Sequence, residues 1–222
     1  MTYDKSSIPK GAIISLLCIV LVATLCNILD IPYRNYIFLF FCFTLPLIFN
    51  TDFQPSKPLR LTPSGWVTAS LILVLITAVP LLLLLGVVKL FLGTLFLIPK
   101  FSMLKAMLLN GAALGFLIAL PEEFFFRGYL QEQVLGERER RILPGISQKN
   151  VYTSLLFALT HATSYLNPYR ITVFFGSLVL GYITEKARGS IWQAVLLHAY
   201  SNMMIAVLYE VIKYNIPGLW LG

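Results

Sequence analysis

Seven apolar segments, of which 35–50, 151–166 and 171–186 are short, constrain the fold of this chain more than any other feature. They cover residues 11–29, 35–50, 66–88, 104–128, 151–166, 171–186 and 190–213. The hydrocarbon core of a bilayer is crossed by about 20 apolar residues in a helix, with a range of roughly 17–25. A segment in lipid has to satisfy its own backbone hydrogen bonds, which favours helices. The pattern predicts an all-α, polytopic transmembrane bundle of about seven spans, with six to eight possible.

The composition agrees with this class. Only 12% of the residues are charged and 58% are hydrophobic, whereas a soluble domain carries about 25% charged residues. The length of 222 residues predicts a single membrane domain, 1–222. The apolar stretch 89–99 is too short to cross alone, so it either extends the third span or lies at the interface.

The basic residues predict an orientation. If the N-terminus is cytoplasmic, the cytoplasmic side holds Lys5, Lys10, Lys57, Arg60, Arg138, Arg140, Arg141, Lys149, Lys186 and Arg188. The opposite side then holds Arg34, Lys100, Lys105, Arg170 and Lys213. Cytoplasmic loops carry the excess of basic residues, so we predict a multi-pass protein of the cell (plasma) membrane with its N-terminus in the cytoplasm. The first apolar run also fits a signal peptide, but its length favours an uncleaved span.

Three further features have interpretations from the sequence alone. The net charge of +7 comes with no basic patch interleaved with exposed aromatics, so no nucleic-acid partner is predicted. Cys18, Cys26 and Cys42 lie in apolar segments and are interpreted as small hydrophobic side chains without a disulfide. Residues 129–150 are the most charged stretch and fit a helix at the membrane surface or a solvated loop equally well.

Three short motifs place polar chemistry in or against these apolar segments. They are Glu122-Glu123-x-x-x-Arg127, Phe157-x-x-x-His161 and His198-x-x-x-Asn202. His161 and His198 are the only two histidines of the chain. Ionisable groups at membrane depth are costly and are rare without a function. The motifs therefore indicate a reaction centre inside the bilayer.

The predicted topology brings the motifs to one depth. With a cytoplasmic N-terminus, Glu122 lies shortly before the cytoplasmic end of its span. His161 lies about eleven residues into its span and His198 about nine, which corresponds to roughly 13–17 Å at the helical rise per residue. We predict that the three motifs converge in the cytoplasmic half of the membrane, with the site opening on the cytoplasmic side.

The spacing of the polar residues favours distinct roles for them. Neighbouring helical residues point about 100° apart, so Glu122 and Glu123 face different partners. Arg127 is one turn after Glu123, which favours a buried ion pair that fixes helix packing. Glu122 is then available as a general base that activates a water molecule. The preceding Pro121 can open the helix and let water reach the carboxylate.

The two histidine motifs complete this chemistry. His198 and Asn202 share one helix face, and both can donate hydrogen bonds to a developing oxyanion. His161 either shares the water with Glu122 or protonates the leaving amine.

These motifs, in this order, resemble the CAAX protease and bacteriocin-processing family, also called the CPBP or Abi family. The resemblance covers roughly residues 104–213, the helical core of that family. It implies a glutamate-type intramembrane endopeptidase acting on a membrane-associated or lipid-anchored peptide or protein. It implies that Glu122 and His161 activate water, and that His198 and Asn202 stabilise the oxyanion. Glu123 and Arg127 would support the site.

Alternatives remain open at this point. No cofactor is expected, because the chain has no His-Glu-x-x-His pair, but Glu122, His161 and His198 could instead bind zinc. A non-catalytic immunity factor or scaffold that binds a peptide or membrane partner is the second function class. A transporter or proton relay is the third, and it is disfavoured because the two halves show no paired broken helices.

Overall fold

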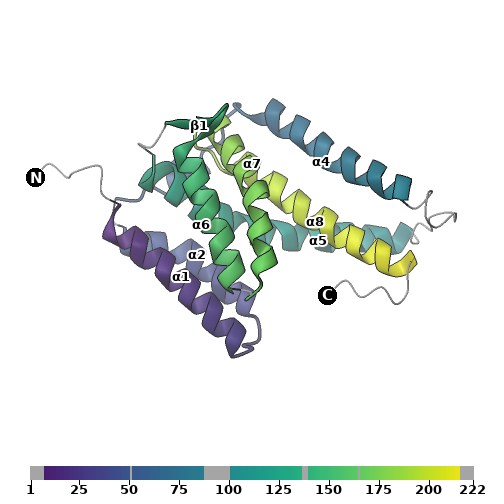
Figure 1. Ribbon diagram of the computed structural model, residues 1–222, viewed down its shortest axis with the longest axis horizontal. Coiled ribbons are helices and arrows are strands. Elements are labelled where there is room, and N and C mark those ends of the chain that lie inside the picture. The colour runs from purple at the N-terminus through teal and green to yellow at the C-terminus, as the bar shows by residue number, and fades with distance from the viewer. Residues whose placement is uncertain (1–7, 51, 88–100, 137–139, 165, 216–222) are drawn as a thin grey trace, which may run out of the picture. The chain divides into compact units, whose positions relative to one another are not determined.

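The computed structural model describes residues 8–50, 52–87, 101–136, 140–164 and 166–215 (Figure 1). Its elements in chain order are α1 (Lys10–Ile28), α2 (Arg34–Phe49), α3 (Ser56–Leu59), α4 (Trp66–Val87), α5 (Phe101–Glu123), the π-helix η2 (Phe124–Val134), β1 (Arg141–Leu143), β2 (Ile146–Ser147), α6 (Gln148–Ser164), the 3-10 helix η3 (Pro168–Thr172), α7 (Val173–Lys186) and α8 (Trp192–Asn215). Each of the seven predicted apolar segments contains a helix. The segment 89–99 lies outside the described residues.

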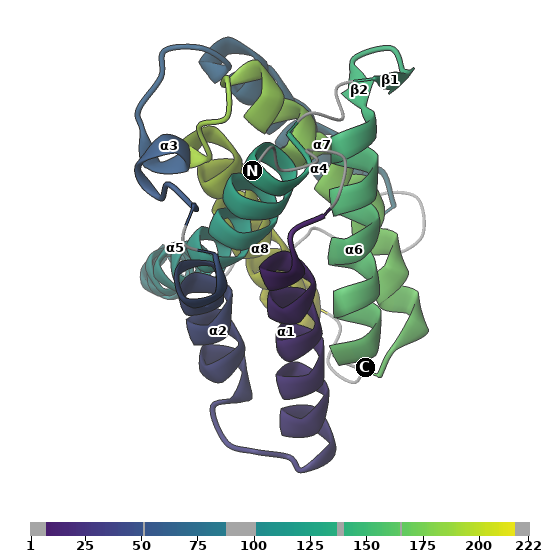
Figure 2. The same ribbon diagram turned by 90° about the vertical axis from the view of Figure 1, so that its left-hand side faces the viewer.

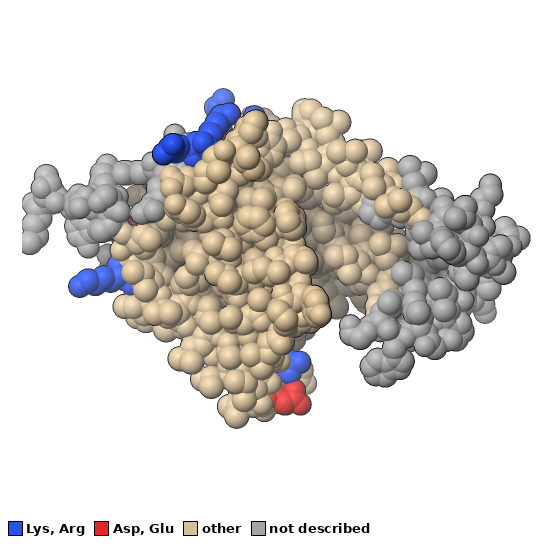
Figure 3. Space-filling view, viewed as in Figure 1, with Lys and Arg blue, Asp and Glu red and all other residues tan. Residues whose placement is uncertain are grey.

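Two helices of the described part are long and apolar enough to cross a membrane. They are Lys10–Ile28, with a mean hydropathy of 2.5, and Leu108–Val134, with a mean hydropathy of 1.4. Two shorter apolar helices are Arg34–Phe49 and Trp66–Val79. The face in Figure 3 is almost free of charged side chains, and the few visible ones lie at its margins. The helical class is confirmed, and the count of about seven spans stays a prediction.

The chain divides into two compact units. The first unit contains residues 1–65 and 120–194, and the second contains residues 66–119 and 195–222. Helices α5 and α8 each begin in one unit and end in the other. The predicted single domain over 1–222 stays a prediction.

Helices α1, α2 and α6 lie side by side in the first unit (Figure 2). Gly11 allows the start of α1 to approach the end of α2, since a Cβ atom there would lie 2.0 Å from the Phe49 carbonyl oxygen. At the other end the chain reverses through Asp30 and Tyr33, both with positive φ. The Arg34 guanidinium lies 2.7 Å from the Asp30 carboxylate across this turn.

The charged region 129–150 differs in part from the two interpretations made from the sequence. Tyr129, Leu130 and Gln131 are buried within η2 rather than exposed at a membrane surface. Residues 141–147 form an antiparallel hairpin that leads into α6. Its turn is Pro144-Gly145, with Gly145 at a φ of +83°, and proline followed by glycine is the sequence that a type II turn prefers. The surface-helix interpretation is therefore wrong for these described residues. Residues 140–144 are exposed, as the solvated-loop interpretation expected, and residues 137–139 lie outside the described part of the chain.

Close helix packing characterises the second unit. Gly111 and Gly115 lie one turn apart on α5 and face α8. A Cβ atom on Gly115 would lie 2.6 Å from the Ala199 carbonyl oxygen, so only glycine permits this approach. Small residues at this spacing let membrane helices pack closely. The Thr77 hydroxyl lies 2.6 Å from the Tyr200 hydroxyl and links α4 to α8.

Candidate active site

Glu122 lies in the last turn of α5, immediately after Pro121. Proline lacks the backbone N–H of a regular helix, so it weakens the hydrogen-bond ladder at this point. The helix then widens into η2, whose end carries a bond from the Leu135 N–H to the Leu130 carbonyl. π-Helical turns are rare and are found frequently at functional sites. The local backbone therefore distinguishes this stretch from an ordinary membrane helix.

Aromatic packing fixes η2 around the carboxylates. Phe124 stacks on Phe43 of α2 with ring centroids 4.5 Å apart. Phe126 meets Phe157 of α6 edge-on at 4.9 Å. Such aromatic pairs contribute about 0.5–1.5 kcal/mol each beyond the burial of their area. The motif phenylalanines thus help to hold this part of η2 in place.

Glu122 and His161 come together, as predicted. The His161 Nε2 atom lies 3.9 Å from the Glu122 Oε1 atom. The two side chains are only 11% and 6% exposed, respectively. This distance is too long for a direct hydrogen bond, and it allows both groups to contact one small molecule between or beside them.

Phe157 and His161, the two residues of the second motif, contact each other directly. Its carbonyl oxygen lies 3.0 Å from His161 Nδ1, and its ring packs on the imidazole at a centroid distance of 4.2 Å. A carbonyl can only accept, so Nδ1 carries the proton in the neutral ring. The lone pair of the neutral imidazole is then on Nε2, the atom that faces Glu122.

A small cavity adjoins His161. It has a volume of about 20 Å³, which is room for about one water molecule. Its lining residues are Ala23, Asn27, Arg34, Asn35, Phe38, Thr160 and His161. These lie at the end of α1 and α2 remote from Lys10, whereas the sequence predicted an opening on the side of the N-terminus. The orientation of the site in the membrane stays a prediction.

Glu123 and Arg127 form the predicted ion pair. Arg127 Nε lies 3.2 Å from Glu123 Oε2, and both side chains are fully buried. Arg127 also donates to Gln131 Oε1 at 3.1 Å and to the Ser177 carbonyl at 2.8 Å. Its guanidinium carbon lies 5.8 Å from the centre of the Phe157 ring. Arg127 therefore joins η2 to α6 and α7.

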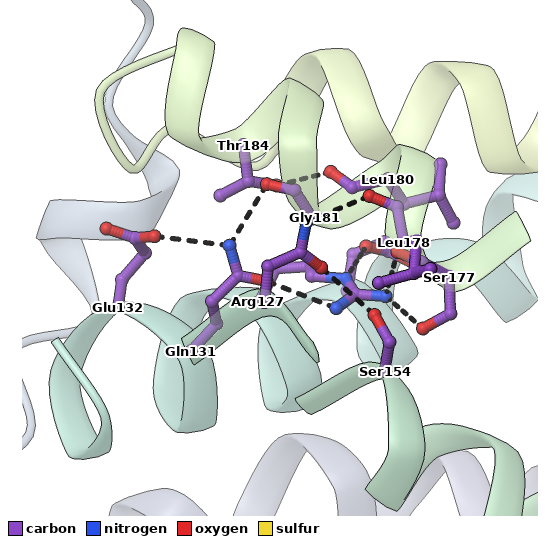
Figure 4. A network of polar contacts seen from close by, with 11 residues as sticks. Arg127, Gln131, Glu132, Ser154, Ser177, Leu178, Leu180, Gly181 and Thr184 are labelled. Atoms are coloured by element: carbon purple, nitrogen blue, oxygen red, sulfur yellow. Dashed lines mark hydrogen bonds and ion pairs between the residues drawn. The ribbon is translucent and has the colours of Figure 1, made fainter. Parts of the chain in front are cut away.

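The rest of this network was not predicted from the sequence (Figure 4). Gln131 donates to the Gly181 carbonyl at 3.0 Å. Asn150 donates to the Leu178 carbonyl at 2.9 Å and accepts from Ser154. Gly181 has to lack a side chain, because a Cβ atom would lie 2.0 Å from Asn150 Oδ1. Gln131 follows Arg127 by one turn and Ser154 follows Asn150 by one turn, and these spacings are signals of the network that the sequence carries.

His198 and Asn202 lie one turn apart on α8, and both are half-buried. Gly115 fixes the backbone beside them through its close approach to Ala199. They belong to the second unit, whereas Glu122 and His161 belong to the first. Their convergence with the carboxylate stays a prediction.

Metal binding was the alternative from the sequence. Among the described residues, no group of three or more His, Cys, Asp or Glu side chains is arranged to hold a metal ion. Glu122 and His161 together offer two donor atoms of the kind that zinc accepts. A zinc site completed by His198 stays the alternative proposal.

These features define a helical membrane protein with a buried carboxylate–imidazole pair. Residues 104–204 match the family model described as "Type II CAAX prenyl endopeptidase Rce1-like". The match contains all three motifs and confirms the resemblance to the CPBP family. The family is one of membrane proteases. No curated protein and no solved structure matches the chain.

Proposed function

We propose that the protein is an intramembrane endopeptidase that hydrolyses a peptide bond in a membrane-associated or lipid-anchored peptide or protein. The observation that carries this proposal is the pairing of Glu122 with His161 at 3.9 Å in a nearly closed site. The match of the surrounding region to a CAAX prenyl endopeptidase family supports it.

The pair is suited to orienting one water molecule. The Glu122 carboxylate accepts a hydrogen bond from one O–H group of the water. The lone pair on His161 Nε2 accepts a hydrogen bond from the other O–H group. An oxygen lone pair of the water is then left free to attack the carbonyl carbon of the peptide bond. Holding nucleophile and base in this geometry lowers the entropic part of the barrier.

Glu122 first takes up a proton from the water and later returns it to the leaving amine. As the water oxygen bonds to the carbonyl carbon, Glu122 takes its proton and the carbonyl oxygen becomes an oxyanion. His198 and Asn202 are proposed to donate hydrogen bonds to that oxyanion. The C–N bond then breaks, and the protonated Glu122 returns its proton to the leaving amine. Glu123 and Arg127 are proposed to support the site through packing.

The products in living membranes test this function. Cells expressing wild type, Glu122→Gln or His161→Ala are compared by mass spectrometry of their membrane peptides. We expect at least one cleaved peptide in the wild type that is missing from both variants at equal protein levels. Identical peptides in all three would reject the protease and favour the scaffold that binds without cleaving.

A further inference from the structure

A second cavity in the first unit lies away from the catalytic pair. Its volume is about 750 Å³, and it is open to the outside. Charged residues in its lining are Lys10, Lys57, Arg60, Arg188, Asp52 and Glu132. Among the residues that the structure describes, the four cations form no ion pair, whereas Glu132 is paired with Lys149 at 3.1 Å. The cavity therefore has an excess of available positive charge.

The walls of this cavity are held in place by specific hydrogen bonds. The segment after α2 is tied to η2 by a reciprocal pair between Gln54 and Gln133, at 3.0 and 3.1 Å. It is tied to the start of α8 by Trp192 Nε1, which donates to the Leu59 carbonyl at 2.7 Å. Arg60 donates to the Arg188 carbonyl. The basic residues thus lie on a fixed frame rather than on a free loop.

Arg188 occupies a position that favours glycine. Helix α7 ends with the Gly189 N–H bonded to the Thr184 carbonyl at 2.9 Å, and Arg188 has a φ of +55°. Glycine is the usual residue in the left-handed conformation at a helix end. Strained residues of this kind persist at ligand clamps and other functional positions. An arginine at this position therefore suggests that its positive charge has a function.

The surroundings of the cavity indicate an amphiphilic ligand. Phe49 lines it and is 41% exposed. Close in the sequence to the lining residues Gly11 and Phe49, Ile13 and Ile14 of α1 and Ile48 of α2 are exposed apolar side chains. A soluble anion makes no use of these neighbours, whereas the acyl chains of a lipid can pack on them.

From the cavity, its four cations and the exposed ring of Phe49 in its lining, we infer that this cavity binds the phosphate head group of an anionic phospholipid. Basic pockets beside membrane helices recognise such head groups through the charge of the phosphate. The inference is independent of the proposed peptidase activity, because none of its residues belongs to the catalytic pair.

Lipid retention by the full chain tests the inference. The purified protein in neutral detergent is titrated with phosphatidylglycerol or phosphatidylcholine of the same acyl chains, and bound lipid is counted by native mass spectrometry. We expect a preference for phosphatidylglycerol. The double variant Lys57→Gln/Arg188→Gly is expected to bind it about 25-fold more weakly, since each basic residue near an anionic surface contributes roughly a fivefold factor.

Two controls keep the result interpretable. Arg140→Gln removes one exposed cation outside the cavity and should leave the preference unchanged. Arg188→Gly relaxes a strained backbone, so the folded state should persist, as thermal unfolding will show.

An unchanged preference in the double variant would overturn the inference. So would displacement of the lipid by an equimolar amount of glycerol 3-phosphate, because the acyl chains would then add nothing to binding. Displacement by a prenylated peptide with a free carboxylate, but not by its amide, would overturn it too.

Discussion

Replacing Glu122 with glutamine is expected to lower kcat on a peptide identified as a substrate by about 10²–10⁴-fold. General base catalysis contributes about 10²–10⁴ to a rate, and a glutamine amide keeps the shape of the side chain but cannot accept the proton of the attacking water. KM should change by less than about twofold, because the substrate contacts remain. The measurement is a single-turnover cleavage assay with the purified protein.

A matched control separates this effect from a general loss of a carboxylate. Glu185 accepts a hydrogen bond from Ser147 near the end of α7, and Glu185→Gln retains an oxygen for that bond. The Glu185 variant should keep nearly full activity. Glu122→Gln with more than a tenth of the wild-type kcat would show that Glu122 is not the base.

Replacing Arg127 with methionine is expected to cost about 3–5 kcal/mol of the free energy of unfolding. Removal of one partner of a buried ion pair leaves an uncompensated charge, and the penalty is of this order. In the variant, Glu123 would stay buried without Arg127 Nε, which lies 3.2 Å from Glu123 Oε2 in the wild type. The Ser177 carbonyl would also lose the hydrogen bond that Arg127 donates to it. Denaturant titration in micelles, followed by tryptophan fluorescence, measures the change.

The double variant Glu123→Gln/Arg127→Met identifies the cause of that loss. Since it removes both charges together, it should recover at least about 1 kcal/mol relative to Arg127→Met. Arg140→Met, at an exposed position, is the control and should be neutral. Normal stability of Arg127→Met together with lost cleavage would contradict a packing role and give Arg127 a part in the reaction.

The sequence predicted the helices and the local pairs well because both depend on short-range patterns. Apolar runs set where α1 and α4 begin, and the i,i+4 spacing of Glu123 and Arg127 placed their ion pair. The pairing of Glu122 with His161 was predicted from the depth of each residue in its span.

Features that depend on distant parts of the chain were not predicted. The π-helix η2 was not predicted, and its phenylalanines pack on Phe43 and Phe157, which lie far away in the sequence. Gly181 matters only because Asn150 approaches it from another helix. The hairpin at Pro144-Gly145 had a local turn signal, but the charge pattern around it favoured a surface helix or a solvated loop.

The most direct measurement of the central claim is a double-mutant cycle on cleavage of one peptide, with Glu122→Gln, His161→Gln and both together. Residues that act as one unit show strongly non-additive losses of rate. If Glu122 and His161 hold the same water, the double variant should be no slower than Glu122→Gln alone, within about threefold. A double variant slowed by the product of the two single effects would show that the two side chains act independently and would contradict the account.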